Sequence, residues 1–439
     1  MDINRRLFLR NSALGMATLL LPMGSPRTAG AVSAANRTLV VLFLRGGADG
    51  LNLVVPRGDE THYLALRRDG STGQDISLPP APAALQLDGF FELHPALAPL
   101  APLYRSGELA FLHGIGGTGD YSHFSAQDAM ERAEPVNPTS VSDGWLQRTL
   151  LALEGQNQLD APVLALSGVG IGPREPKALA GPAFGRSLAV PSLRKFRVGG
   201  AFAGTRAARL EQIYARTSGP LGNAGSASFS AIEALSELST QPPGALYPSG
   251  DQRLNLALQD AARLAKNPAL GVKAIAIDYG GWDHHADQLA SMDRVGGNLA
   301  TALAAFHEDL GGAASNTLTL VMTEFGRTAA VNGGGGTDHG WGTVMLALGG
   351  GIAGGRVLCR EDPKAPSLGM PTPSGHWPGL ATDELHIQPS SGEARDLKAT
   401  IDYRDAFAEV LQRFLGLPEA TVRDSVLRGY PARLPGLFV

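Results

Sequence analysis

The stretch Thr317–Gly355, TLTLVMTEFGRTAAVNGGGGTDHGWGTVMLALGGGIAGG, decides the fold. It holds two short apolar runs bounded by glycines and polar residues, Thr317–Thr323 and Thr343–Leu348, and such runs are typical of buried strands. The first run ends abruptly at Glu324, and Asp338-His339 stands just before the second. Because an unpaired buried charge is costly, packing alone explains such residues at strand ends poorly. They therefore predict a functional site at the rim of a sheet.

The same alternation of apolar runs and helical patterns continues through the rest of the chain. Further strands are expected at Thr38–Leu44, Leu109–His113, Val163–Leu166 and Val272–Asp278. Apolar residues at helical spacing predict helices at Pro95–Leu103, Ser122–Ala133, Trp145–Leu153, Arg206–Arg216, Phe229–Leu238, Leu254–Lys266 and Asp287–Gly311. Strands that alternate with helices favour an α/β fold around a mostly parallel sheet, with the site beyond the carboxyl ends of its strands.

Two stretches interrupt this order within the domain expected over residues 36–439. Residues 168–265 are less regular and are interpreted as an insertion or lid region, in which Gly219–Ser228 predicts a linker between helices. Residues 361–395 are rich in Pro, Gly and Ser and predict a long surface loop. A last helix is expected within Ile401–Leu415.

Composition excludes several classes of function. With 439 residues, 44% of them hydrophobic, the chain can bury a large core. Its formal net charge of −4 and the lack of like-charge runs give no basic surface for nucleic acid. A single cysteine, Cys359, cannot form an intrachain disulfide. Since no apolar run after the leader approaches ~20 residues, no stable membrane insertion of the mature chain is expected.

Residues 1–35 predict an export signal. Arg5-Arg6 and the following Leu7-Phe8-Leu9 precede a short apolar stretch, Ala13–Met23, and then small residues from Ala29 to Ala35. Paired arginines in this position are typical of a twin-arginine signal, so the twin-arginine translocase is the expected partner during export. An ordinary secretory signal and an uncleaved anchor are the alternatives. The expected location is the periplasm or the outside of a bacterial cell.

Asp49 follows the first strand in the Gly-rich segment Arg45-Gly46-Gly47-Ala48-Asp49-Gly50-Leu51-Asn52. Glycines let backbone approach a ligand closely, and the carboxylate offers a hard oxygen ligand for a divalent ion. The alternative is an Asp-Gly turn or a helix cap. Arg45 and Asn52 in the same segment are assigned to substrate binding.

Ser122 and His123 open a helix after the loop that follows another strand. A serine at a helix N-terminus can act as a nucleophile, because the helix dipole favours its alkoxide and a bound anion. His123 is expected to assist it or to bind substrate. The alternative is that Ser122 only caps the helix.

The densest polar cluster is GGWDHHAD, residues 280–287. Its carboxylates and imidazoles match a zinc, manganese or iron site in ligand type. Asp283 and His285 can converge on one ion, whereas His284 then points elsewhere and is assigned to substrate binding. The alternative is a solvated polar turn.

The remaining candidates lie within Thr317–Gly355. Glu324, Asp338 and His339 are suited to bind a metal, and Arg327 is suited to bidentate contact with phosphate or sulfate. For Glu324 and Arg327 the alternative is a surface ion pair.

Together with the leader, the ordered motifs FLRGGADGLNLVVP, SHFSAQD, GGWDHH, TEFGRT and GGTDHGWG resemble the bacterial family filed as domain of unknown function 1501. That family looks like a branch of the alkaline phosphatase-like superfamily of phosphatases, sulfatases and phosphoglycerate mutases. The resemblance implies a three-layer α/β/α alkaline phosphatase-like fold. It also implies a metal-dependent hydrolase of phosphate or sulfate esters, whose substrate is a small molecule or a glycan ester.

Carried over by position, the resemblance implies that Asp49 binds one ion, that Asp283 with His285 or His284 binds the other, and that a metal activates Ser122. Asp338-His339 lies where a final metal histidine is expected. The superfamily usually has Asp-His where this chain has Glu324-Phe325, so one histidine is missing and the number of ions, one or two, stays open. Zinc is the expected metal, with manganese, calcium and magnesium as alternatives.

Two other functions remain open. A catalytically weak or inactive protein on the same fold, which binds a surface or a polysaccharide, is favoured by Phe325, an apolar ring in place of a ligand. A metal-free serine hydrolase would use Ser122 and a histidine, but no Gly-x-Ser-x-Gly motif surrounds Ser122.

Overall fold

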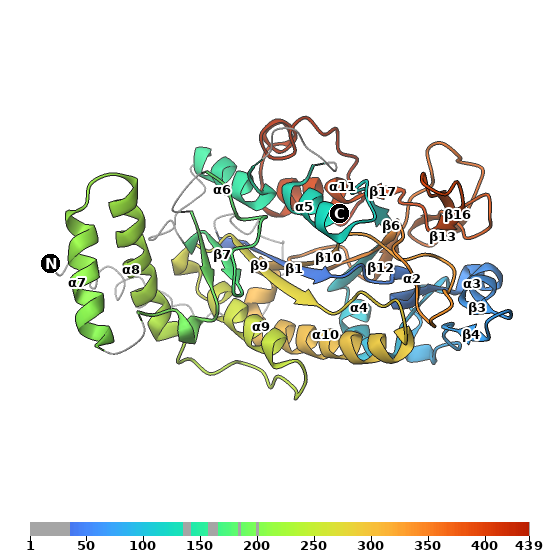
Figure 1. Ribbon diagram of the computed structural model, residues 1–439, viewed down its shortest axis with the longest axis horizontal. Coiled ribbons are helices and arrows are strands. Elements are labelled where there is room, and N and C mark those ends of the chain that lie inside the picture. Colours follow the sequence, from blue (N-terminus) through green and yellow to red (C-terminus); the bar gives the residue numbers. More distant parts are fainter. Residues whose placement is uncertain (1–35, 135–141, 157–165, 183–185, 199–201, 439) are drawn as a thin grey trace, which may run out of the picture. The chain divides into compact units, whose positions relative to one another are not determined.

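The computed structural model in Figure 1 describes residues 36–134, 142–156, 166–182, 186–198 and 202–438. The expected export signal lies outside the described residues, as does most of the strand expected at Val163–Leu166. Among the described helices, none is long and apolar enough to cross a membrane.

A nine-stranded sheet lies at the centre of the described structure, in the order β12-β6-β11-β10-β1-β9-β7-β8, with β17 beside β6. Its strands are β1 (Thr38–Arg45), β6 (Leu109–Gly116), β7 (Gly168–Ile171), β8 (Ser187–Val190), β9 (Ala274–Gly280), β10 (Thr317–Thr323), β11 (Thr343–Gly349), β12 (Arg356–Leu358) and β17 (Ile401–Asp402). Only β11 runs against its neighbours, β10 and β6, and the other pairs are parallel. The predicted α/β fold with a mostly parallel sheet is confirmed.

Strand β1 shows why this sheet is buried on both faces. Leu39, Val41 and Phe43 pack into one hydrophobic core, and the alternating residues between them pack into the other. A strand buried on both sides needs an unbroken apolar run, which Thr38–Leu44 supplies. Each fully buried side chain of this size contributes roughly 1.5–3 kcal/mol.

Helices cover both faces of the sheet and complete three layers (Figure 1). The first core contains helices α4 (Ala101–Arg105), α9 (Gln252–Ala265) and α10 (Gln288–Leu310). The second contains α5 (His123–Arg132), α6 (Trp145–Gly155) and α11 (Tyr403–Glu409), which continues as a π-helical turn over Val410–Phe414.

Helices α7 (Ala203–Arg216) and α8 (Pro220–Leu238) form a helical hairpin, and they correct one prediction. The expected linker Gly219–Ser228 is helical, apart from its first residue. Its small residues serve packing instead, because a Cβ at Gly225 would lie 2.1 Å from the ring of Tyr214 on α7. The surrounding region, residues 168–265, also supplies β7 and β8 to the central sheet.

The remaining elements are short. Those near the N-terminal part are α2 (Gly50–Leu53), β2 (Val54–Pro56), α3 (Glu60–Arg67), β3 (Arg68–Asp69), β4 (Gln74–Asp75) and β5 (Phe91–Leu93). Residues 361–395 contain two small antiparallel pairs, of β13 (Met370–Thr372) with β14 (Gly375–Trp377) and of β15 (His386–Ile387) with β16 (Ala394–Asp396). Helix α12 (Glu419–Thr421) follows near the C-terminus.

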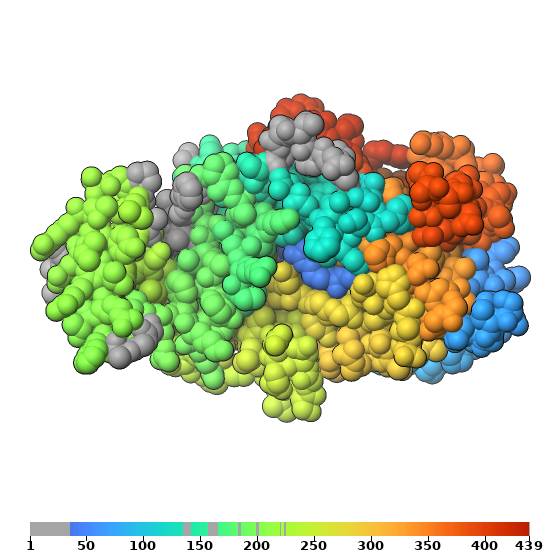
Figure 2. Space-filling model, viewed as in Figure 1, coloured from blue at the N-terminus to red at the C-terminus, as the bar shows by residue number. Residues whose placement is uncertain are grey.

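The carboxyl ends of β1, β9 and β10 lie at one edge of the sheet. In the strand register, Leu44 is paired with Thr323 and Arg45 with Gly280, so the three strands end at the same level. The space-filling view shows the blue β1 segment at the bottom of a hollow between the teal and yellow segments (Figure 2). This edge receives the candidate site.

Candidate metal centre

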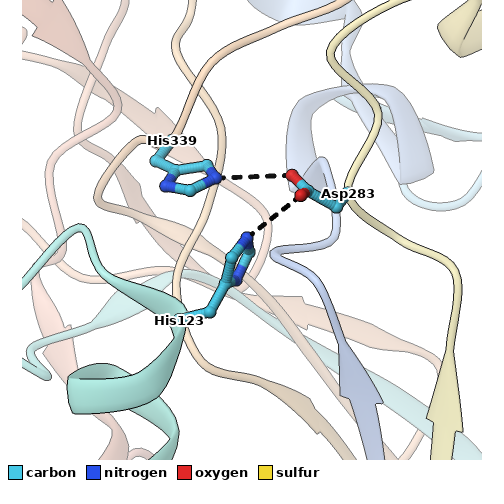
Figure 3. Close-up of side chains that lie close together, drawn as sticks. All are labelled: His123, Asp283 and His339. Carbon is cyan, nitrogen blue, oxygen red and sulfur yellow. Dashed lines mark hydrogen bonds and ion pairs between the residues drawn. The ribbon is translucent and has the colours of Figure 1, made fainter.

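Imidazole and carboxylate groups from three parts of the chain meet at this edge. His123 is the first residue of α5, Asp283 and His285 follow β9, and His339 precedes β11. Figure 3 shows His123 and His339 pointing toward the carboxylate of Asp283. The Nε2 atoms of both histidines lie 3.3 Å from Asp283 oxygens. We call His123, Asp283, His285 and His339 the His-Asp cluster.

Two glycines allow the loops after β1 and β9 to approach this closely. Gly46 has a φ of +128°, and a Cβ on it would lie 2.5 Å from the backbone nitrogen of Asp283. Gly281 has a φ of +97°, another conformation that L side chains rarely adopt. The glycine pairs in LRGGADG and GGWDHH therefore bring the Asp283 loop against the end of β1.

Each histidine of the cluster is held by its Nδ1 atom. His123 Nδ1 donates to Glu324 Oε1 at 2.8 Å, His339 Nδ1 to the Tyr121 carbonyl at 2.6 Å, and His285 Nδ1 to Asp338 Oδ1 at 2.9 Å. Since a carbonyl or carboxylate oxygen only accepts, the proton of the neutral ring lies on Nδ1. The Nε2 atoms therefore present lone pairs, as in metal sites whose histidines are oriented by oxygen acceptors.

Asp283 is fixed by a buried arginine. Arg327 Nη2 donates to Asp283 Oδ1 at 2.6 Å and also contacts the Trp282 carbonyl. Desolvation alone would raise the pKa of Asp283, but Arg327 and the nearby histidines outweigh it and lower that pKa. The carboxylate is thus ionised and available as a ligand.

Ligand atoms of His123, Asp283 and His339 lie within 4.8 Å of one another, close enough to hold one divalent ion. His285 Nε2 lies 3.0 Å from Asp283 Oδ1 and 3.2 Å from His339 Nε2. A tetrahedral site with bonds of about 2.0–2.1 Å requires donor separations of about 3.3–3.4 Å. The buried His123 Nε2 atom has no hydrogen bond to any described residue, although Asp283 Oδ2 is near. A lone pair left in this state is suited to a cation.

The surroundings shift the pKa values of His123 and His339, the two less exposed histidines of the cluster, in opposite directions. The hydrogen bond to Glu324 raises the pKa of His123. Burial is the main cause that lowers the pKa of His339. Desolvation would raise the pKa of Glu324, but hydrogen bonds from His123, Gln127 and the backbone outweigh it and lower that pKa. Glu324 therefore stays ionised and keeps the Nδ1 proton on His123.

Asp49, one of the expected metal ligands, lies outside the His-Asp cluster. It caps helix α2 by accepting from the Leu51 N–H, and its carboxylate also accepts from Arg67 Nη2 at 2.8 Å and Gln288 Nε2 at 2.6 Å. Arg67 and Asp49 are both buried. The charge of Asp49 is balanced within the protein, so the structure gives no reason to assign it a metal ion.

Three other candidate residues at this edge form hydrogen bonds that hold members of the cluster in place. Glu324 accepts from His123, from Gln127 Nε2 at 2.8 Å and from the Gly46 N–H at 2.9 Å, so it orients a histidine. Arg327 is fully buried and also donates to the Gly47 carbonyl, which leaves it turned away from any substrate anion. Asp338 holds His285.

The residues assigned to substrate binding also have structural partners. Arg45 pairs with Glu131 at 2.9 Å and with Asp278 at 2.8 Å. The buried Asn52 accepts from the Tyr63 hydroxyl and donates to the Ile76 carbonyl. His284 is buried, and its Nε2 lies 2.8 Å from the Gly281 carbonyl. Its ring therefore points away from the His-Asp cluster, as expected if Asp283 and His285 converge on one ion.

Ser122 occupies the N-cap position of α5 but does not cap it with its side chain. Its hydroxyl is therefore not committed to the helix, contrary to the capping alternative. It adjoins His123 in the chain, at the end of the helix that favours anions.

Phe325 fills the place next to Glu324 and packs on the cluster. Its ring centroid lies 4.9 Å from those of His123 and His339. A Cβ at Gly47 would lie 2.6 Å from this ring, so the glycine makes room for it. The Phe325 ring packs against the imidazoles of His123 and His339. A metal-binding side chain at this position would instead add a ligand to the site.

Sequence reasoning missed the position of His123. The sequence predicts that His123 assists Ser122 or binds substrate, whereas its ring groups with Asp283 and His339 as a candidate metal donor. Glu324, on the next strand end, accepts the hydrogen bond that holds this ring. No sequence pattern links residues 123 and 324, because their contact depends on how α5 meets β10.

A comparison with known protein families matches the part of the chain that contains the site residues after β9. Residues 240–371 match the model of a family described as Protein of unknown function (DUF1501). The match covers less than a third of the chain. It confirms the resemblance to that family, and the matched segment contains Asp283, His285, Glu324 and His339, whereas His123 precedes it.

Among solved structures, the chain is similar to alkaline phosphatase from the Antarctic bacterium TAB5, with a TM-score of 0.28 and 11% identity over 72% of this chain and 92% of that chain. A variant of that enzyme with bound Mg has a TM-score of 0.27 and 10% identity, over 71% of this chain and 90% of that chain. Thermus thermophilus alkaline phosphatase has a TM-score of 0.26 and 13% identity, over 70% and 64% of the chains. No curated protein matches the chain.

Proposed function

We propose that the protein is an exported, metal-dependent hydrolase of phosphate or sulfate esters, with one divalent ion held by the His-Asp cluster. The single observation that carries the proposal is the convergence of three Nε2 atoms on Asp283, each ring fixed through Nδ1 by an oxygen. The motif resemblance favours ester hydrolysis, and residues 1–35 favour export.

Zinc is the proposed metal. Three imidazoles and one carboxylate match its ligand preference, and iron(II) also suits imidazole-rich sets. One ion is proposed instead of two, because Asp49 is paired with Arg67 and Phe325 occupies the ligand position beside Glu324. When bound, such an ion favours a deprotonated nucleophile and stabilises negative charge on phosphate or sulfate oxygens.

Ser122 is the proposed nucleophile. The first N–H groups of a helix have no partner within the helix, so the start of α5 attracts the anionic group of an ester. Ser122 Oγ forms the bond to phosphorus or sulfur while the bond to the ester oxygen breaks, and the hydroxyl proton passes to water. The released alcohol takes a proton from water. A further water molecule cleaves the Ser122 ester, releases phosphate or sulfate and restores the serine.

Two buried residues, Glu324 and Arg327, orient the side chains of the cluster. Glu324 keeps the proton of His123 on Nδ1, and Arg327 keeps Asp283 ionised and directed toward the histidines. Since Arg327 is buried and fully engaged, the substrate anion depends on the helix start and the cluster.

Turnover of aryl phosphate and aryl sulfate by metal-loaded protein tests this function. Ser122→Ala is expected to abolish turnover and to retain metal, whereas the control Ser125→Ala on the same helix should keep both. Removal of metal by a chelator should abolish turnover reversibly. If the metal-loaded protein turns over none of a broad ester panel, the binding-protein alternative replaces this proposal.

A further inference from the structure

His285 differs from the other members of the His-Asp cluster in how it is held. Asp283 is fixed by Arg327 and His123 by Glu324, and the side chains of both partners are fully buried. His285 is fixed by Asp338, whose side chain is 53% exposed. The side chain of His285 is itself 46% exposed, against 23% for His123 and 24% for His339.

The loop between β10 and β11 supplies the support for His285. Asn332 Nδ2 donates to the His285 carbonyl at 3.0 Å and to Asp338 Oδ1 at 3.2 Å. The turn between them contains the exposed Gly333 and Gly334, and Gly335 has a φ of +71°. A short, exposed, glycine-rich loop thus holds one arm of the cluster, while the sheet edge and buried side chains hold the rest.

Four protein donors would close a tetrahedral site, and closed sites are typical of structural metals. A hydrolytic site needs one position open to substrate. Of the three histidines, His285 has the most exposed side chain, and the carboxylate that holds it, Asp338, is half-exposed as well.

We propose that His285 is a displaceable fourth ligand that occupies the metal in the resting protein and gives way to the anionic group of the substrate. This inference rests on the proposed function. It predicts competition between the His285 imidazole and a phosphate-like anion for one position. If the imidazole holds that position about 90% of the time, it weakens anion binding about tenfold.

Cobalt(II) and inorganic phosphate are the probes, and the full chain after export processing is the sample. In the wild type, phosphate should change the visible spectrum of the bound cobalt. His285→Ala should bind cobalt at least about tenfold more weakly, show a changed resting spectrum and bind phosphate about tenfold more tightly. Asp338→Asn, which keeps the imidazole but loosens it, should fall between the two.

His62→Ala is the matched control, because His62 is also 46% exposed and its Nδ1 contacts Asp59 at 2.7 Å. It should behave as wild type. The inference is overturned if His285→Ala and Asp338→Asn match the wild type in cobalt spectrum and phosphate affinity. If the wild type binds no cobalt, the metal site itself is refuted, which separates that failure from this one.

Discussion

Replacement of Asp49 by Asn distinguishes an internal ion pair from a metal ligand. In the structure, Asp49 Oδ1 accepts from Arg67 Nη2 and the Leu51 N–H, and Oδ2 accepts from Gln288 Nε2. An amide has one acceptor oxygen, so it loses the bond to Gln288 or turns an NH₂ group toward Arg67. Either way, a buried guanidinium keeps its charge without a counter-charge.

The expected loss of stability follows from the burial of this pair. Removing one partner of a buried ion pair costs about 3–5 kcal/mol, which is about 10²–10³·⁵-fold in the folding equilibrium. Guanidinium unfolding of the chelator-treated protein measures it. The exposed pair of Asp75 with Arg68 at 3.1 Å supplies the control, and Asp75→Asn should cost under about 1 kcal/mol.

Metal content completes the test of Asp49. Asp49→Asn should bind as many ions as the wild type, because its carboxylate does not reach the cluster. Combining it with Arg67→Met should cost less than the sum of the two single changes, since the pair is coupled. Loss of an ion in Asp49→Asn, with the stability of the metal-free protein unchanged, would show that Asp49 is a metal ligand and not an internal ion-pair partner.

Three further predictions concern charge and protons. Glu324→Gln removes the carboxylate that orients His123 and should weaken zinc binding about 10–100-fold, by competition with a chromophoric chelator, while saturation still reaches one ion; unchanged affinity would count against its positioning role. Zinc affinity should fall with decreasing pH, because the raised pKa of His123 lets protons compete for Nε2; an affinity that is flat between about pH 8 and pH 5 would contradict this. Burial lowers the pKa of His113 to about 4 from 6.5, so the unfolded chain binds the extra proton between these values, and stability present above pH 6.5 falls by about 3 kcal/mol toward pH 4. In unfolding experiments across pH, His113→Gln should show a smaller fall, and an equal fall would exclude His113 as its source.

The strands and the edge that carries the site could be predicted because they depend on local pattern. The run Thr317–Thr323 is a strand with those same bounds, and Asp283 and His339 do meet beyond the strand ends. Apolar runs specify buried strands, and parallel strands bring their carboxyl ends together. That much needs no knowledge of distant contacts.

The roles of individual polar residues could not be predicted, because they depend on partners far away in the chain. Asp49 has the same sequence context as a ligand, yet Arg67 balances its charge and Gln288 donates a hydrogen bond to it. Glu324 and His123 belong to separate motifs, yet one hydrogen bond joins them across 201 residues of sequence, which no local pattern indicates. Gly219–Ser228 has the composition of a linker but is helical from Pro220, where Gly225 leaves room for Tyr214 of α7.

Metal content of the purified protein, measured by elemental analysis without chelator in the buffers, tests the proposed metal site most directly. The account predicts one zinc-class ion per chain in the wild type and none in Asp283→Ala, with the folded state of that variant checked by circular dichroism. A wild-type chain without metal after zinc loading, or an Asp283→Ala chain that keeps its ion, would contradict it.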